Sequence, residues 1–248
     1  LPEGTKMDSD SRQWFIHAND AIGVRSRARV LGALVEKYIH NEGENNWVSL
    51  ASGAAIPVLE ALRNARLDGQ QVYLTLVDKD PVALSWAETM AAQEGIVVGE
   101  QLTLLRRNLV HTLVRNEDLL LELGEHQAEL VDALGIFEYF NDTDAVIFLQ
   151  RALRLVKPGG QVFFSTINRN PKAYLFAIIG AEYVMRLLPR GTHDFKKFIR
   201  PSELGAWSRA AGLNVQDIIG LTYNPLTKRY KLEADVDVNY MIQTLRED

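Results

Sequence analysis

Cysteine is absent from all 248 positions of this chain. Its absence excludes disulfide scaffolds, thiolate zinc sites, iron–sulfur clusters and cysteine nucleophiles. The chain also lacks an apolar run near the roughly 20 residues that a membrane-spanning helix needs. Its first ten residues are polar and do not resemble a signal peptide. Since nothing in the sequence favours export, we expect a cytoplasmic protein.

An excess of positive charge is also missing, because 27 Lys and Arg stand against 32 Asp and Glu, leaving a net charge of −5. A chain without an overall basic field is a poor match for nucleic acid, so we expect no nucleic-acid partner. What is present is ordinary for a soluble globular protein, with 47% hydrophobic and 24% charged residues. The length suits one large domain.

Hydrophobic periodicity predicts helices that alternate with strands. Helical spacing of apolar residues occurs before residue 40 and again at 56–65, 82–92 and 142–155. Strands separated by helices in this rhythm predict a parallel sheet covered on both faces. Two strand-like stretches near the end of the chain, at 215–222 and 236–244, are expected to add antiparallel strands at one edge of this sheet. The expected α/β fold has a mostly parallel, seven-stranded sheet, with strands at 47–50, 72–77, 102–105, 129–134, 161–167, 215–222 and 236–244.

A ligand crevice is predicted where the first two strands end. Ligands of such sheets bind outside the carboxyl ends of the strands, where the strand order reverses. Gly53 lies in the turn after the first strand, and Asp78 ends the second strand 25 residues later. An acid at this place can accept hydrogen bonds from the ribose hydroxyls of a nucleotide. The alternative role for Asp78 is structural, at the N-terminus of the helix that starts near Pro81.

Three segments resemble class I S-adenosylmethionine-dependent methyltransferases, namely VSLASGAA at 48–55, LVDKDP at 76–81 and LVKPGG at 155–160. The resemblance covers nearly the whole chain after Glu36. It implies a single-domain, Rossmann-like fold and S-adenosyl-L-methionine as the cofactor. Residues 1–40 would form helices that cover the cofactor site, and residues 41–248 would form the methyltransferase domain.

The resemblance also implies roles for individual residues. Asp78 would bind the ribose, Asn108 would accept a bond from the adenine amine, and Ala133 would lie near the sulfonium. Arg25 suits pairing with the methionyl carboxylate, because a guanidinium binds carboxylates through two parallel bonds; the alternative is a solvated helix face. The expected cofactor-binding residues are Arg25, Ser52, Gly53, Asp78, Lys79, Asn108, Leu109 and Ala133.

The first loop departs from the family's pattern. Ser49 stands where the family has an acid, and Ala51 and Ala55 stand at two of its glycine positions, so that only Gly53 remains. Glycine permits positive φ and a close approach of the backbone to a ligand. Each alanine adds a methyl group, which narrows the pocket or changes the loop. This feature favours the alternative of a non-catalytic methyltransferase-fold module at the membrane surface.

From about residue 156 to residue 245 the sequence resembles a narrower family, the bacterial ubiquinone-biosynthesis O-methyltransferases. The resemblance implies methyl transfer to a phenolic hydroxyl of a lipophilic aromatic acceptor, a ubiquinone precursor. A class I methyltransferase with a different small-molecule acceptor is the alternative, because the first half of the chain lacks the sequence motifs of this narrower family. The matching segments are FFSTINRN at 163–170, GAEY at 180–183, GTHD at 191–194, KFIRPSEL at 197–204, YNPLT at 223–227 and VDVNY at 236–240.

A metal site is not expected. The family's usual stretch after the fourth strand has Glu, two residues, then Glu-His, and it is associated with divalent-metal dependence. Here the stretch reads GIFEY at 135–139, and only Glu138 is retained. A hard cation needs several oxygen ligands, so one carboxylate beside an aromatic residue is a poor site.

Methyl transfer to oxygen requires a positioned nucleophile and a route for its proton. His193 lies in a polar loop, where Asp194 could raise its proton affinity, and it is the expected catalytic base. Its alternative role is to tie down that loop. Asn168 ends the fifth strand and is expected to orient a substrate hydroxyl, or else to form a turn before Pro171.

Residues 169–200 combine apolar and basic character. They hold seven Lys and Arg against two acids, which gives +5 locally and −10 for the rest of the chain. An apolar helix within a basic collar suits shallow insertion into an anionic membrane surface, here at the inner face. A lid packed on the active site is the other interpretation, and the two are compatible. Tyr174 and Tyr183 from this segment are expected to contact the substrate.

Overall fold

The computed structural model describes residues 32, 35–39, 43–124, 127–184, 191, 193–224 and 229–247. Arg25 and most of the segment 1–40, which is expected to cover the cofactor site, lie outside the described residues. Val35 and Ile39 are described, and both are buried against the core.

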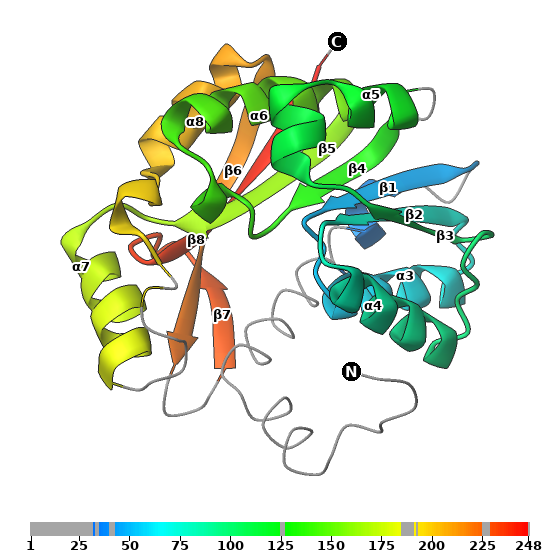
Figure 1. Ribbon diagram of the computed structural model, residues 1–248, viewed down its shortest axis with the longest axis horizontal. Helices are drawn as coiled ribbons and strands as arrows, with labels where there is room; N and C mark the ends of the chain where they lie inside the picture. Colours follow the sequence, from blue (N-terminus) through cyan, green and yellow to red (C-terminus); the bar gives the residue numbers. More distant parts are fainter. Residues whose placement is uncertain are drawn as a thin grey trace.

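One sheet of eight strands organises the molecule, in the order β3-β2-β1-β4-β5-β8-β6-β7 (Figure 1). Its strands are β1 (Asn45–Leu50), β2 (Val72–Asp78), β3 (Leu102–Arg106), β4 (Ala128–Ala133), β5 (Val156–Ile167), β6 (Leu213–Asn224), β7 (Arg229–Glu233) and β8 (Asn239–Arg246). The first five pair in parallel, whereas β8, β6 and β7 pair antiparallel. The predicted α/β class, mostly parallel with an antiparallel edge, is confirmed.

The sheet has one strand more than the seven expected. The tail of the chain forms three strands, and β7 was missed because RYKLE alternates charged with apolar residues over only five positions. β6 and β7 form a hairpin, in which Thr222 pairs with Lys231. β5 also begins earlier than expected, at Val156, and its pairing with β4 shifts register between Ala128 and Leu130.

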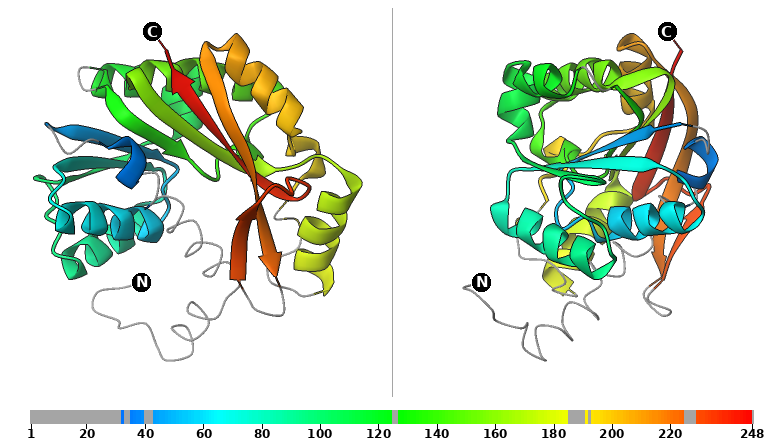
Figure 2. Two further views of the ribbon diagram at one scale, coloured as in Figure 1. Left: turned by 180° about the vertical axis from the view of Figure 1, so that it is seen from behind. Right: turned by 90° about the vertical axis from the view of Figure 1, so that its right-hand side faces the viewer.

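Helices cover both faces of the sheet (Figures 1 and 2). On one face lie α3 (Ile56–Leu67) and α4 (Pro81–Gln93), which bury Leu59, Leu62 and Ala87. On the other face lie α5 (Asp118–Leu123), α6 (Asp142–Leu155) and α8 (Pro201–Ala210). Edge-to-face aromatic rings fill that side, where Phe137 meets Phe148 with ring centroids 5.6 Å apart.

The carboxyl ends of the parallel strands meet at the point where the strand order reverses. From β1 the chain moves outward through β2 to β3, and it then returns to β4 on the other side of β1. Short helical segments follow these ends, namely η1 (Val110–Arg115) after β3 and η2 (Phe137–Tyr139) after β4. This reversal between β1 and β4 is where a ligand of a doubly wound sheet binds.

The segment after β5 forms an arm beside the β6–β7 hairpin (Figures 1 and 2). It consists of α7 (Pro171–Ala173) and the π-helical η3 (Tyr174–Val184), and the short η4 (Phe195–Lys197) follows. Lys172 ties the arm to the turn before β8 through ion pairs with Asp235 at 3.0 Å and Asp237 at 2.8 Å. These pairs are exposed, so we assign them a positioning role rather than a large share of stability.

Candidate active site

The loop between β1 and α3 keeps a left-handed backbone at three alternate positions. Ala51 has φ 55°, Gly53 has φ 57° and Ala55 has φ 53°. A left-handed conformation costs an alanine roughly 1–2 kcal/mol, because its Cβ approaches the next carbonyl oxygen. The two alanines therefore occupy the backbone conformation that glycine adopts most readily, and the strain is held by the surrounding fold. The loop has kept this conformation despite the added methyl groups.

Hydrogen bonds join this loop to the end of β2. The Gly53 N–H donates to Oδ2 of Asp78 at 2.8 Å, and the Ser52 N–H donates to the Val77 carbonyl at 3.3 Å. The other carboxylate oxygen of Asp78 accepts the Asp80 N–H at 2.9 Å. The structure thus brings together Ser52, Gly53 and Asp78, which the sequence placed in one crevice.

The helix-capping role considered for Asp78 belongs to its neighbour. Asp80 is the N-cap of α4, and its side chain accepts the Val82 N–H at 2.9 Å. Asp78 therefore bonds the loop through Oδ2 and the backbone of Asp80 through Oδ1, while Asp80 itself caps the helix. The Ser52 hydroxyl is buried and is one of three buried side-chain polar atoms without a hydrogen-bond partner among the described residues. A buried, unpaired hydroxyl in this loop fits a ligand that would supply the missing bond.

Beneath the loop, a buried acid joins β1 to β4. Asp132 is 2% exposed and is the register partner of Ser49. Its carboxylate accepts Nε1–H of Trp47 at 2.7 Å and Oγ–H of Ser49 at 3.0 Å. Burial raises the pKa of Asp132 to about 7, and the two hydrogen bonds lower it only in part. Asp132 is not among the residues predicted from the sequence; an acid within the otherwise apolar end of a strand was the available signal.

Two further predicted residues lie on the β3 side. The Asn108 side-chain oxygen accepts the N–H of Val110, the first residue of η1, at 3.1 Å. Leu109 is 4% exposed and belongs to the core cluster on the α6 side of the sheet. Ala133, at the end of β4, is fully buried. The roles expected of these residues toward adenine and sulfonium stay predictions.

The stretch after β4 does not supply the donors of a divalent-metal site. Gly135 has no side chain, and Tyr139 is an exposed aromatic ring that lies under Nζ of Lys79, 5.1 Å from its centroid. Among the described residues no three His, Cys, Asp or Glu are grouped so that they could hold a metal ion. The residues present do not fit a hard cation, which requires several oxygen ligands. Lys79 instead places an ammonium beside this stretch.

His193 has a different partner from the Asp194 that the sequence suggested. Its Nδ1 lies 2.9 Å from Oε1 of Glu182, and its backbone N–H donates to the same oxygen at 2.8 Å. Oε2 of Glu182 accepts the Gly191 N–H at 2.6 Å. Glu182 is 1% exposed, whereas Asp194 caps η4 by accepting the Lys196 N–H. A carboxylate on Nδ1 fixes the imidazole tautomer and leaves Nε2 as the basic nitrogen.

The expected substrate residues come from two parts of the chain, Asn168 directly after β5 and Tyr174 and Tyr183 from η3. Asn168 is 8% exposed, and its amide donates to the Val236 carbonyl at 3.0 Å, which ties the end of β5 to the chain before β8. Tyr174 and Tyr183 lie on the arm with 43% and 46% of their surface exposed. Tyr174 packs edge-to-face on Phe195, with ring centroids 5.4 Å apart.

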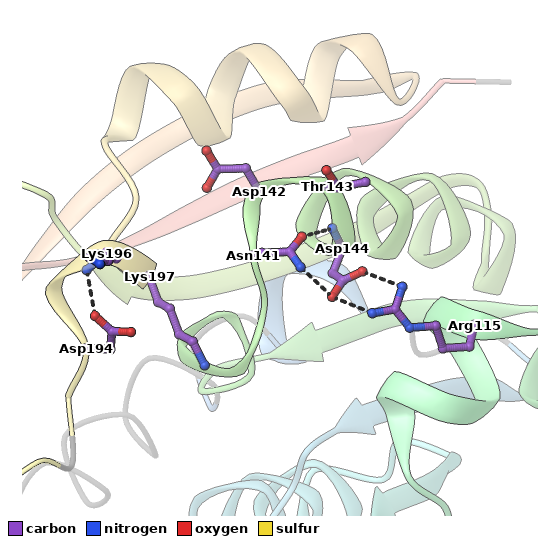
Figure 3. A pocket seen from close by; sticks show the side chains of 8 residues that line it. All are labelled: Arg115, Asn141, Asp142, Thr143, Asp144, Asp194, Lys196 and Lys197. Carbon is purple, nitrogen blue, oxygen red and sulfur yellow. Dashed lines mark hydrogen bonds and ion pairs between the residues drawn. The ribbon is translucent and has the colours of Figure 1, made fainter.

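A cleft of about 560 Å³ lies where η1, α6 and η4 converge (Figure 3). Arg115 forms two bonds with Asp144, at 2.9 Å and 3.0 Å, and Asn141 caps α6 beside this pair. Every lining residue is polar, so the cleft does not suit an apolar ring, because pockets for such ligands are mostly apolar. Its lining residues are Arg115, Asn141, Asp142, Thr143, Asp144, Asp194, Lys196 and Lys197.

Solved structures share this fold. A SAM-dependent methyltransferase from Methanosarcina mazei superimposes with a TM-score of 0.59 at 13% identity, over 86% of this chain and 96% of that one. The magnesium protoporphyrin IX methyltransferase of Synechocystis PCC 6803, solved with SAH, gives 0.62 at 13% identity, over 98% and 90%. Together with the loop, Asp78 and the strand order, these likenesses define a class I S-adenosylmethionine-dependent methyltransferase fold.

Sequence relatives narrow the class, although no family model matches the chain. The ubiquinone biosynthesis O-methyltransferase of Pseudomonas fluorescens strain Pf0-1 is 51% identical over 229 residues, covering 79% of this chain and 97% of that protein. The protein of the same name from Pseudomonas syringae pv. tomato is 54% identical over 195 residues, with 79% and 75% covered. The chain belongs to the ubiquinone biosynthesis O-methyltransferase family, and S-adenosylmethionine is its cofactor.

Proposed function

We propose that this chain transfers a methyl group from S-adenosylmethionine to a phenolic oxygen of a lipophilic aromatic precursor of ubiquinone. The observation that carries the proposal is the loop at the strand reversal, where Gly53 is bonded to Asp78 and the Ser52 hydroxyl is left unpaired. This arrangement offers a nucleotide-like ligand an acid, a hydroxyl and backbone groups at the carboxyl ends of β1 and β2. The relatives' names supply the acceptor class.

The cofactor would lie across the carboxyl ends of β2, β1 and β4. Asp78 would accept the ribose hydroxyls, Ser52 and Gly53 would hold the methionyl part, and Ala133 would lie beside the sulfur. Asn108 and Leu109 would border the adenine, and Lys79 would approach from the end of β2. Arg25, outside the described residues, would pair with the methionyl carboxylate. When bound, the cofactor supplies an electrophilic methyl group on a positively charged sulfur.

His193 is proposed as the base that receives the phenolic proton. The geometry that supports this role is the buried Glu182 carboxylate on Nδ1, which orients the ring and leaves Nε2 to take a proton. As the phenolic oxygen forms its bond to the methyl carbon, the proton would pass to Nε2 and the carbon–sulfur electrons would stay on sulfur. Asn168, Tyr174 and Tyr183 are proposed to contact the acceptor.

Calorimetry with S-adenosylmethionine tests the proposal directly. Asp78→Ala is expected to weaken binding by roughly 10–100-fold, since a charge-assisted hydrogen bond contributes about 1.5–3 kcal/mol. Asp68→Ala, at an exposed acid just past α3, is the matched control and is expected to bind normally. Failure of the wild-type chain to bind near-millimolar cofactor would contradict the proposal and favour a non-catalytic binding module.

A membrane surface is the second proposed partner. The arm exposes Tyr174, Leu175, Phe176 and Tyr183, each between 43% and 56% exposed, within the basic segment 169–200. Within the described part of the chain, no helix has the length and apolar content needed to cross a bilayer. We propose a cytoplasmic protein whose arm dips into the anionic inner face, as apolar side chains with basic flanks favour.

Liposome flotation tests the membrane proposal. The double variant Leu175→Ser with Phe176→Ser is expected to lose binding to anionic vesicles, because it removes two exposed apolar side chains of the arm. Leu67→Ser is the control, since Leu67 is 77% exposed but lies at the end of α3 on the other side of the molecule. Charge reversal at Arg186, Arg190, Lys196 and Lys197 tests the basic flanks. Unchanged flotation in both sets of variants would rule out the membrane role.

A further inference from the structure

One buried ionisable group takes no part in the mechanism above. Asp132 lies on β4, one residue before the strand ends, and both of its carboxylate oxygens are used by neutral donors of β1. Trp47 is fully buried and Ser49 is 1% exposed, so the three side chains form a sealed cluster between the two strands that flank the reversal of the sheet.

The surroundings of Asp132 leave its charge unpaired. On β1 its neighbours are the neutral Trp47 and Ser49, and on β5 its register partner is Phe163. The core cluster that contains Trp47 and Phe163 is apolar on the α3 side as well. Tyr38, an ionisable side chain packed against that cluster, contacts Phe163 with ring centroids 6.0 Å apart. No charged side chain among the described residues shifts the pKa of Asp132.

The cluster of Trp47, Ser49 and Asp132 lies next to the residues of the proposed cofactor site. Ser49 lies two residues before Ala51, where the left-handed loop begins, and Asp132 lies directly before Ala133. In the proposed function, Ala133 lies beside the sulfur of the cofactor. Ser49 also stands where the resembling family carries an acid. At this level of the sheet the carboxylate comes from β4, where Asp132 is the register partner of Ser49.

The two forms of the cofactor differ in charge at this sulfur. S-adenosylmethionine carries a sulfonium, whereas the product S-adenosylhomocysteine carries a neutral thioether. A negative charge buried nearby, in a region of low effective dielectric, interacts with the first form and not with the second. We propose that Asp132 lets the cofactor site discriminate by charge between S-adenosylmethionine and its product, and that its ionisation sets how strongly the product is disfavoured.

This inference rests on the proposed cofactor site, and it predicts a pH dependence. Burial holds the pKa of Asp132 near 7, so the carboxylate is mostly protonated below that pH and mostly ionised above it. The preference for S-adenosylmethionine over the product is expected to rise as pH increases through this range. A unit charge about 12 Å from the sulfonium, at an effective dielectric of about 20, corresponds to a preference of roughly tenfold.

The test is calorimetric titration of the full chain with S-adenosylmethionine and with S-adenosylhomocysteine between pH 5.5 and 8.5. In the wild type, the ratio of the two dissociation constants is expected to change about tenfold across neutral pH. Asp132→Asn keeps the shape and can still bond Trp47 and Ser49, but it cannot ionise, so its ratio is expected to be flat. Asp144→Asn removes a different buried acid and is expected to behave like the wild type.

Ser49→Ala is the second variant, and it keeps the acid. Losing one hydrogen bond to the charged form raises the pKa of Asp132, so the pH midpoint of the discrimination is expected to move upward. A purely structural role would not move this midpoint. Ser49→Ala also carries the test on its own should Asp132→Asn not fold. The chain has four tryptophans, so indole fluorescence is compared between the wild type and Asp132→Asn. The pH-dependent difference between them reports the ionisation beside Trp47, whose N–H contacts the carboxylate, without any ligand.

The outcomes separate this inference from the proposed function. A wild-type ratio that is constant with pH would overturn the charge discrimination, and so would an Asp132→Asn ratio that changes as the wild type does. An unchanged midpoint in Ser49→Ala would overturn it as well. Loss of binding of both cofactor forms by the wild-type chain would instead contradict the proposed function.

Discussion

Oε1 of Glu182 contacts His193 at two atoms. It accepts the backbone N–H at 2.8 Å and lies 2.9 Å from Nδ1 of the ring. The acid comes from η3 and the histidine follows the arm, so one buried side chain fixes the position and the tautomer of the imidazole.

His193→Ala is expected to lower kcat by roughly 10²–10⁴-fold, the usual contribution of a general base. Glu182→Gln replaces one carboxylate oxygen by an amide NH₂, so it can accept only one of the two backbone N–H groups that bond Oε1 and Oε2 in the wild type. Because the charged partner of Nδ1 is also lost, we expect an intermediate loss of about tenfold in kcat with little change in KM. Steady-state methyl-transfer kinetics measure kcat and KM for both variants. Asp194→Asn is the control, because Asp194 caps η4 and does not bond the ring; a loss there equal to that of Glu182→Gln would argue against the assigned pair.

Ala51→Gly and Ala55→Gly are each expected to stabilise the fold by about 0.5–1 kcal/mol. Glycine relieves the left-handed strain at φ 55° and φ 53°, and its greater freedom in the unfolded chain offsets part of that gain. Urea unfolding measures the change. Ala83→Gly, inside α4, is expected to have the opposite sign, a loss of about 1 kcal/mol. Two destabilised loop variants would show that the methyl groups contribute packing that outweighs the strain.

Stability is expected to fall as pH rises toward neutrality because of Asp132. Its pKa is about 7 in the folded chain, and the ordinary value in an unfolded chain is about 3.9. The folded state therefore binds the proton more tightly between these values, and the cost of ionising the buried group grows from about pH 4 and is complete above pH 7. Relative to Asp132→Asn, the wild type is expected to lose up to ~4 kcal/mol of unfolding free energy between pH 4 and pH 8. Parallel pH profiles of the two proteins would contradict this.

Chelation is expected to leave methyl transfer unchanged, since Gly135 and Tyr139 supply no carboxylate or imidazole. The measurement is kcat with and without excess EDTA. The double variant Gly135→Glu with Tyr139→His adds two ligands beside Glu138 and is expected to make the chain bind a divalent ion, detectable by calorimetry with the metal alone. Loss of wild-type activity in EDTA, restored by added metal, would show that ligands come from elsewhere.

Much of the fold could be predicted from the sequence because its parallel strands are strongly apolar and are separated by amphipathic helices. The proximity of Gly53 and Asp78 could also be predicted, since the carboxyl ends of parallel strands lie on the same side of such a sheet. Strand β7 was not, because its charged residues hide the strand pattern and its pairing depends on the hairpin with β6.

The partner of His193 and the cluster around Asp132 were beyond sequence reasoning for a different reason. Glu182 is 11 positions from His193, and Asp132 is 83 positions from Ser49, so these contacts depend on tertiary structure. Sequence proximity favoured Asp194 instead. An acidic residue within an apolar stretch of sequence indicates that it has a partner in the fold, but the partner cannot be identified from the sequence.

The β6–β7 hairpin has a consequence for how the molecule behaves in a crowded solution. A free outer strand exposes unpaired backbone groups onto which a second chain can add a strand, and long, flat, apolar edges are the most prone to this. β7 ends the sheet with only five residues, and its Lys231 side chain is 76% exposed and paired with Glu233 at 3.4 Å. A short, charged outer strand disfavours the addition of a strand from a second chain. We therefore expect this edge of the sheet to resist fibril-like association, although the neighbouring arm exposes apolar side chains.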